Sequence, residues 1–185
     1  QITLLIWLAT GASSAGPSAE ALAYTCAGCH GTDGSSVGPS SPHIAAMDPA
    51  YFYDAMLAYK ADQRDATIMN RIAKAYTDEE IEAMAGFFAR QPLRLAAQVH
   101  DPQQVERGGE LHEKYCENCH EDGGRNPEGG LLAGQWTPYL SYSMADLQSG
   151  AREMPRKMKA KLDDLLGREG ESGIAALLHF YASHR

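Results

Sequence analysis

The sequence has few cysteines and no long apolar run. Only 4 of its 185 residues are cysteine, and two short stretches hold them all. No segment reaches the ~20 consecutive apolar residues that a membrane-spanning helix needs. No stretch shows sustained alternation of polar and apolar residues, so the pattern does not favour β-strands.

Basic residues and catalytic motifs are also scarce. The chain has 16 lysines and arginines against 24 aspartates and glutamates, a net charge of −8. Nucleic acids and anionic membrane surfaces bind clusters of basic side chains, so this balance argues against both. The sequence contains no recognisable Ser/His/Asp set, carboxylate pair or Gly-rich phosphate loop. It therefore indicates no substrate chemistry, and its charge favours docking to a basic or neutral protein face.

The cysteines occur twice in the same pattern, each pair followed directly by histidine. The two runs are Cys26-Ala27-Gly28-Cys29-His30 and Cys116-Glu117-Asn118-Cys119-His120. A disulfide or a redox dithiol would not need that histidine, and a zinc site built from both pairs would leave both histidines unexplained.

Cys-x-x-Cys-His is the attachment signature of c-type haem. Two thiols one helical turn apart bind the haem vinyl groups, and the adjacent histidine binds the iron. We therefore predict two covalently bound haems. Their attachment residues are Cys26, Cys29, Cys116 and Cys119, and their proximal iron ligands are His30 and His120.

An internal repeat accompanies the two motifs. The second motif follows the first by 90 residues, and Ile44-Ala45 and Tyr51-Phe52 recur 88 residues later as Leu132-Ala133 and Tyr139-Leu140. Such self-similarity indicates a tandem duplication with a period of about 89 residues. Each half would then carry one haem.

The repeat also selects candidates for the sixth iron ligand, which is commonly methionine in electron-transfer haems. Met69 lies 39 residues after His30, and Met158 lies 38 residues after His120. We predict that these two methionines bind the first and the second iron, with Met154 as the alternative for the second.

Two further methionines, Met56 and Met144, also match in the repeat. Each lies on an apolar face with helical spacing, where methionine more often fills a core than binds a metal. We expect both to be core residues.

The pattern of the chain is mostly helical. A short helix is expected around residues 20–22 and a second one from Asp48-Pro49, with proline in the first turn. Residues 77–80 form a capping-box pattern before an apolar helix face. The second half is expected to have helices at residues 106–115, from Pro138, and along a closing apolar face formed by Ile174, Leu177, Leu178 and Tyr181.

Gly- and Pro-rich loops follow both haem motifs. Pro39 and Pro127 in these loops are candidates to accept a hydrogen bond from the proximal histidine ring, although a simple turn proline is the alternative for each. The remaining histidines have no repeat partner, and we expect them to lie at the surface or to be hydrogen-bonded. They are His43, His100, His112, His179 and His184.

The N-terminal residues 2–9 are apolar and are followed by small residues. This pattern indicates the end of an export signal, with a retained N-terminal arm as the alternative. We therefore expect residues 1–19 to precede the folded domains and the protein to be periplasmic.

Several segments resemble the cytochrome subunits of flavocytochrome c sulfide dehydrogenases. They are CAGCHGTDGSSVGPSSPHIAAMDP, TIMNRIAKAYT, LHEKYCENCH, LLAGQWTPYL and FYASH, and the resemblance covers nearly the whole chain after residue 19. It implies an all-α fold of two tandem class I cytochrome c domains, related by a pseudo-twofold, with the haem propionates near the shared interface. We place the domains at residues 20–92 and 106–185, joined by a linker at 93–105.

The resemblance also implies partners. In that family a separate FAD-binding subunit oxidises sulfide, and the cytochrome subunit passes the electrons to a soluble acceptor such as a small cytochrome c. FAD is then expected only in the partner, and this chain has no catalytic site of its own. The rival interpretations are a free diheme carrier feeding a terminal oxidase without a flavin partner, and a diheme peroxidase, against which Met69 and Met158 argue.

Overall fold

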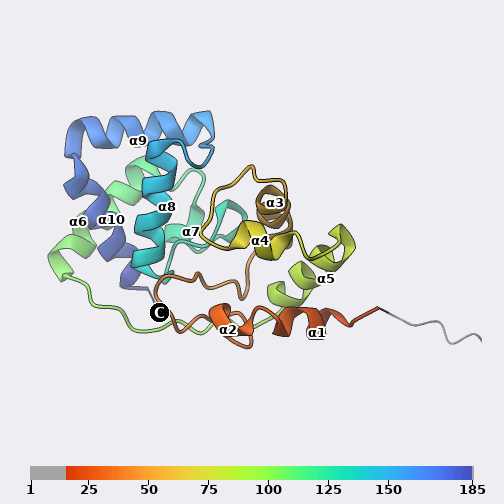
Figure 1. The fold of residues 1–185 in the computed structure, drawn as a ribbon. Coiled ribbons are helices and arrows are strands. Elements are labelled where there is room, and N and C mark those ends of the chain that lie inside the picture. The colour runs from red at the N-terminus through yellow and green to blue at the C-terminus, as the bar shows by residue number, and fades with distance from the viewer. Residues whose placement is uncertain (1–15, 185) are drawn as a thin grey trace, which may run out of the picture.

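The structure, a computed structural model, describes residues 16–184. Most of the predicted export signal lies outside these residues. Helices form all the regular secondary structure of the described part of the chain, as expected (Figure 1). The first half contains α1 (Ala19–Tyr24), α2 (Ala27–His30), α3 (Pro49–Lys60), α4 (Met69–Ala73) and α5 (Asp78–Ala89). The second contains α6 (Pro102–Tyr115), α7 (Glu121–Gly124), η1 (Pro127–Gly129), α8 (Thr137–Ser149), α9 (Arg156–Glu169) and α10 (Glu171–Ala182).

Local sequence signals explain where several helices begin. Asp48 accepts a hydrogen bond from the backbone N–H of Tyr51 at 2.8 Å at the start of α3. Thr77 and Glu80 form the reciprocal bonds of a capping box at the start of α5. Helix α6 begins at Pro102, earlier than expected and inside the stretch predicted to be the linker.

Each half has its own hydrophobic core. The first core is built mainly on α3 and α5, and its most buried large residues are Ile81, Met84 and Phe88. Met56 belongs to it, as expected. The second core is built on α6, α8, α9 and α10, with Leu111, Leu140, Leu162, Leu165, Leu177 and Tyr181 among its buried members. Two separate cores are what a tandem duplication requires.

The repeat appears again in the backbone hydrogen bonds. The Gly34 carbonyl accepts from the N–H groups of Ile44 and Ala45, at 2.8 and 3.0 Å. The Gly124 carbonyl accepts from the matched residues 132 and 133, at 3.0 and 2.9 Å. Both glycines have a positive φ, +87° and +84°, which other residues rarely adopt. The loops after the two haem motifs therefore fold in the same way.

The halves differ most between the haem loops and the closing helices. Helix α4 has 5 residues, whereas α9, at the same place in the second half, has 14. The extra length ends near residues 167–170, where the sequence departs from the repeat. Counting residues from one half to the other is therefore unreliable in this region.

The boundary between the halves contains specific polar contacts. Trp136 donates from Nε1 to the Ser36 carbonyl at 3.1 Å, and its ring stacks on His43 with centroids 5.7 Å apart. The connecting segment 93–101 runs along the second half, where the Gln98 side chain bonds to the backbone of Gly134, Gln135 and Thr137. Trp136 of the second half therefore contacts the first half through both a hydrogen bond and ring stacking.

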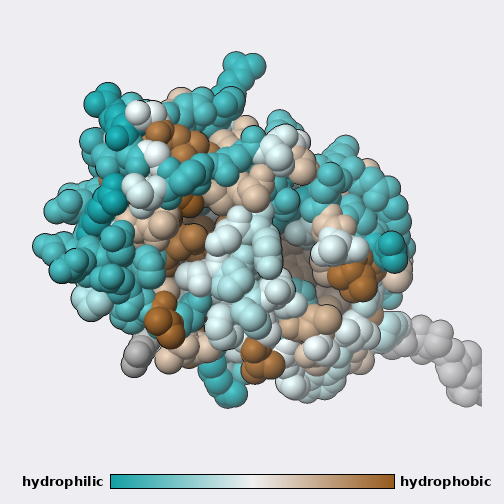
Figure 2. Space-filling model, turned by 60° about the vertical axis from the view of Figure 1, so that its left-hand side comes forward, coloured by the Kyte–Doolittle hydropathy of each residue, from teal (hydrophilic) through white to brown (hydrophobic). Residues whose placement is uncertain are grey.

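Apolar surface is limited and scattered. Figure 2 shows separate brown areas beside hollows on a largely hydrophilic face. Two adjoining pockets of about 260 and 310 Å³ lie between α8 and α10 and share Ser141, Ala175 and Leu178. Neither is lined by a residue of the haem motifs. Among the described helices, none is both long and apolar enough to span a bilayer.

Candidate haem sites

The first haem motif lies on a single helical turn. Cys26 immediately precedes α2, and its carbonyl accepts from the N–H groups of Cys29 and His30 at 3.2 and 2.9 Å. This turn brings both thiols and the imidazole into one short segment, which suits two thioether bonds to one haem and an imidazole ligand for its iron. Cys26 is half-buried and Cys29 exposed, and both are free thiols.

The second motif repeats this turn after α6. The Cys116 carbonyl accepts from the N–H groups of Cys119 and His120 at 3.1 and 3.0 Å. Both cysteines are again free thiols. The two motifs are therefore equivalent in local geometry as well as in sequence.

The thiols do not fit the competing interpretations. Burial raises the pKa of Cys26, and it raises the pKa of Cys116 to about 11. Redox-active cysteines have lowered pKa values instead. Within residues 16–184, no three His, Cys, Asp or Glu side chains converge as ligands of one metal ion, so the cysteine pairs do not form a joint zinc site.

His30 is oriented by a backbone carbonyl. Its Nδ1–H donates to the Pro42 carbonyl at 2.9 Å, which leaves the Nε2 lone pair for iron. Burial lowers the pKa of His30, although the bond to Pro42 opposes this, so the neutral imidazole that binds metals is favoured. The acceptor is Pro42 and not Pro39, so that expectation was wrong.

Within residues 16–184, the His120 ring has no such hydrogen-bond partner. Its Nδ1 is buried and unbonded, and it lies against Gly129 so closely that a Cβ there would be 2.8 Å away. The Pro127 carbonyl accepts from the N–H of Gly130 at 2.9 Å, so Pro127 is a turn proline, the alternative interpretation. Burial lowers the pKa of His120, again favouring the neutral ring.

The methionines differ in how they pack. Met69 is the first residue of α4 and packs against the first core. Met154 precedes α9 and packs against the second core, whereas Met158 lies in the first turns of α9 outside that cluster. Core packing does not distinguish a ligand from a core residue, so Met158, with Met154 as the alternative, stays the prediction for the second iron. The donor set of thiols, imidazole and thioether in each half fits a c-type haem.

Similarity to known proteins supports a c-type haem domain in each half. Residues 18–90 match the family Cytochrome c, and residues 103–174 match the family Cytochrome C oxidase, cbb3-type, subunit III. Cytochrome c4 of Azotobacter vinelandii is 30% identical over 175 residues, which cover 82% of each chain. The chain belongs to the cytochrome c4 family.

One solved structure and one further sequence relative are also similar to this chain. The crystal structure of reduced recombinant cytochrome c4 from Pseudomonas stutzeri superposes with a TM-score of 0.75 over 90% of this chain and 97% of the other, at 21% identity. It shows the fold, two tandem cytochrome c domains. The cytochrome subunit of sulfide dehydrogenase from Chlorobaculum tepidum is 45% identical over 69 residues, which span 37% of this chain and 62% of that relative.

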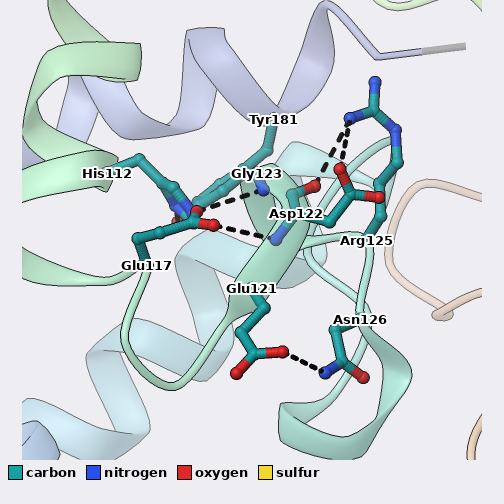
Figure 3. Close-up of polar contacts among 8 residues, drawn as sticks. All are labelled: His112, Glu117, Glu121, Asp122, Gly123, Arg125, Asn126 and Tyr181. Atoms are coloured by element: carbon teal, nitrogen blue, oxygen red, sulfur yellow. Dashed lines mark hydrogen bonds and ion pairs between the residues drawn. The ribbon is translucent and has the colours of Figure 1, made fainter.

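The second domain of this cytochrome c4-type chain has a polar network behind its haem motif (Figure 3). Buried His112 donates from Nε2 to Glu117 at 2.7 Å and accepts at Nδ1 from the Tyr181 hydroxyl at 2.8 Å. Glu117, inside the motif, also accepts from the backbone N–H groups of Asp122 and Gly123, at 2.9 and 3.1 Å. The network anchors the turn after His120.

The remaining histidines are placed only partly as expected. His112 is buried but hydrogen-bonded, which fits the prediction. His43 is fully buried and neither ring nitrogen has a partner, so the expectation of a surface or bonded side chain was wrong for it. Its burial is created by Trp136 of the other half, which no local pattern indicates.

Sequence reasoning also missed two arginines at the domain boundary, Arg64 and Arg152. They lie 88 residues apart, the same interval as Tyr51 and Tyr139. The repeat that selected the methionines could have identified this pair as well.

Proposed function

We propose that this diheme electron-transfer cytochrome is the cytochrome subunit of a periplasmic sulfide-oxidising complex. An FAD-containing subunit would supply the electrons, and a soluble protein such as a small cytochrome c would accept them. The observation that carries this proposal is the 45% identity to the cytochrome subunit of sulfide dehydrogenase. The five sequence segments that resemble the cytochrome subunits of flavocytochrome c sulfide dehydrogenases also support it, because they are spread over both halves of the chain.

The proposed ligand sets assign a role to each residue. Cys26 and Cys29 would hold the first haem through thioether bonds, with His30 and Met69 on the iron. Cys116 and Cys119 would hold the second, with His120 and either Met154 or Met158 on the iron. When bound, each haem supplies a one-electron Fe(III)/Fe(II) couple.

With a histidine and a methionine holding each iron, no iron site would be left for a substrate. The chain would therefore act by outer-sphere electron transfer, with His30 oriented by the Pro42 carbonyl and Met69 excluding water from the first iron. Two sites in one chain also match the two electrons that a reduced flavin releases. A peroxidase would need an open iron position, which these ligand sets do not provide.

A free diheme carrier that feeds a terminal oxidase is the second candidate. It is favoured by the cytochrome c4 relative, which aligns over 82% of both chains, whereas the sulfide dehydrogenase match spans 62% of that relative. The free carrier would work without a flavoprotein.

The deciding experiment is gentle purification of the native protein followed by measurement of its flavin-to-haem ratio. One flavin per two haems in a second, co-purifying chain, together with haem reduction on addition of sulfide, is the expected result. Two haems without flavin at every salt concentration, and no reduction by sulfide, would support the free carrier instead.

A further inference from the structure

The peptide group that joins Pro42 to His43 is hydrogen-bonded at both of its polar atoms. Its carbonyl oxygen, which belongs to Pro42, accepts from the Nδ1–H of His30 at 2.9 Å. Its N–H, which belongs to His43, donates to Oε1 of Gln135 at 2.8 Å. A relay of two hydrogen bonds and one peptide group therefore runs from the imidazole of the first haem motif to a side chain of the second domain.

The Gln135 amide is fixed in this position. Its Oε1 also accepts from the backbone N–H of Trp136 at 3.1 Å, and its Nε2 donates to the His43 carbonyl at 3.1 Å. Because backbone N–H groups only donate and a carbonyl only accepts, these partners determine which end of the amide is oxygen. The side chain is buried, and the Gln98 amide holds its backbone carbonyl at 3.0 Å. Gln135 is thus a preorganised acceptor for the peptide.

A peptide group transmits the effect of one hydrogen bond to the other. When its N–H donates to an acceptor, the group is polarised and its carbonyl oxygen accepts more strongly. A stronger acceptor at Nδ1–H makes a metal-bound imidazole a more basic ligand. A more basic ligand stabilises the oxidised iron, which carries the higher charge, and so lowers the reduction potential.

The second domain has no equivalent relay at its own haem motif. Within residues 16–184, Nδ1 of His120 has no hydrogen-bond partner. The repeat interval of 88 residues places Gly130 opposite Pro42. It places Met47 opposite Gln135, and a thioether is only a weak acceptor without any N–H donor. The relay therefore reaches one of the two proposed haem sites, and the other can serve as an internal reference.

The neighbouring contact between the domains does not involve the Pro42–His43 peptide. Trp136 donates from Nε1 to the Ser36 carbonyl and stacks on the His43 ring. That ring is fully buried, and neither of its nitrogens has a partner in the described part of the chain. The ring thus contributes packing, whereas the backbone of His43 carries the hydrogen bonds. Trp136 therefore offers a matched control for Gln135.

We propose that Gln135 is a positioning residue of the second domain that lowers the reduction potential of the first haem, by strengthening the bond from His30 to the Pro42 carbonyl. Packing of the second domain on the first then sets a property of the first iron site. The inference rests on haem attached at Cys26 and Cys29, and it does not depend on a flavoprotein partner.

Gln135→Met tests the relay in the haem-loaded chain, because methionine occupies the matched position of the first half. In a spectroelectrochemical titration, one of the two potentials should rise and the other should stay unchanged. We expect the ratio of reduced to oxidised first haem at a fixed applied potential to increase about threefold, or ~28 mV for one electron. Water that entered a loosened interface would lower the potential instead, so the sign of the shift separates the two causes.

The strength of the His30 hydrogen bond is measured separately, by nuclear magnetic resonance of the reduced, diamagnetic protein. The His30 Nδ1–H resonance should move upfield in Gln135→Met, because a proton in a weaker hydrogen bond is less deshielded. The His120 ring resonance should not move. The control Trp136→Phe removes the hydrogen bond to Ser36 and leaves the Gln135 amide in place. It should change neither the potentials nor the His30 resonance.

Three results would overturn the proposal. They are a first-haem potential that is unchanged or lower in Gln135→Met, equal shifts of both potentials, and an equal shift in Trp136→Phe. If Gln135→Met loses haem or does not fold, Gln135→Glu replaces it. An ionised carboxylate accepts more strongly than an amide, so the His30 resonance should then move downfield, and an unmoved resonance would reject the relay. A wild-type absorption spectrum without haem at the first motif would overturn the haem assignment together with the inference.

Discussion

Gln135 of the second domain holds the backbone of His43 in the first through both polar atoms of its amide. Its Oε1 accepts from the His43 N–H at 2.8 Å, and its Nε2 donates to the His43 carbonyl at 3.1 Å. Gln135 is 1% exposed. The two domains are therefore joined by buried, specific hydrogen bonds and not only by a covalent linker.

Replacing Gln135 with Ala should lower the stability of both domains and not of one domain alone. Both backbone groups of His43 would lose their partners in a buried site, at about 1–3 kcal/mol for each group. We expect the free energy of unfolding to fall by about 2–6 kcal/mol and the two domains to unfold more independently. Denaturant unfolding followed by circular dichroism and haem absorbance measures both effects. Gln148→Ala on the exposed side of α8 is the control, and equal stability of the two variants would contradict the prediction.

His43 should make the stability depend on pH. Burial lowers its pKa, with Asp33 opposing, so the unfolded chain takes up a proton near the ordinary pKa of about 6.5 before the folded chain does. The unfolded state then binds more protons, and the free energy of unfolding falls as the pH drops below this value, by up to about 1.4 kcal/mol per pH unit.

The variant His43→Leu tests this effect, because Leu131 occupies the matched position of the repeat. We expect the variant to lose less stability than the wild type between about pH 7 and pH 5. Denaturation curves at both pH values give the comparison, with His100→Leu as a control. An unchanged pH slope in His43→Leu would show that another group is responsible.

The methionine substitutions separate the two candidates for the second iron. Met158→Ala should remove the sulfur–iron absorption of one haem, lower its potential and allow carbon monoxide to bind the reduced protein, because an iron coordination position opens. Met69→Ala should do the same for the first haem. Met154→Ala should leave the spectrum unchanged. Carbon monoxide binding to Met154→Ala but not to Met158→Ala would identify Met154 as the ligand.

Glu117→Ala should destabilise the second domain. The substitution leaves His112 Nε2 buried without a partner and frees the turn at Asp122 and Gly123, and unpaired buried groups cost about 1–3 kcal/mol each. Thermal or denaturant unfolding of Glu117→Ala against Glu113→Ala, an exposed position on α6, measures the loss. If both variants unfold at the same temperature or denaturant concentration, the network contributes little to stability.

Features of the chain that depend on short-range spacing could be predicted from the sequence, whereas those that depend on the path of a loop could not. The haem motifs, the capping box at Thr77 and the helix start at Pro49 depend on neighbours within a few residues, so the sequence alone indicates them. The acceptor for His30 depends on the path of a Gly/Pro-rich loop, and that path places the Pro42 carbonyl, not that of Pro39, at the ring. The length of α9, 14 residues against 5 in α4, depends on an insertion that the repeat does not predict.

The sequence by itself indicated two cytochrome c domains and their helical class, and it selected the cysteines and histidines proposed to hold the haems, because these features follow from short-range spacing and from the repeat. Only the tertiary structure decided which side chains meet between the domains. The burial of His43 by Trp136, the hydrogen bonds from Gln135 to His43 and the hydrogen bond from Arg152 to Tyr51 each join segments that are more than 90 residues apart. Such contacts arise from the packing of one folded domain on another, and no local pattern in the chain encodes that packing.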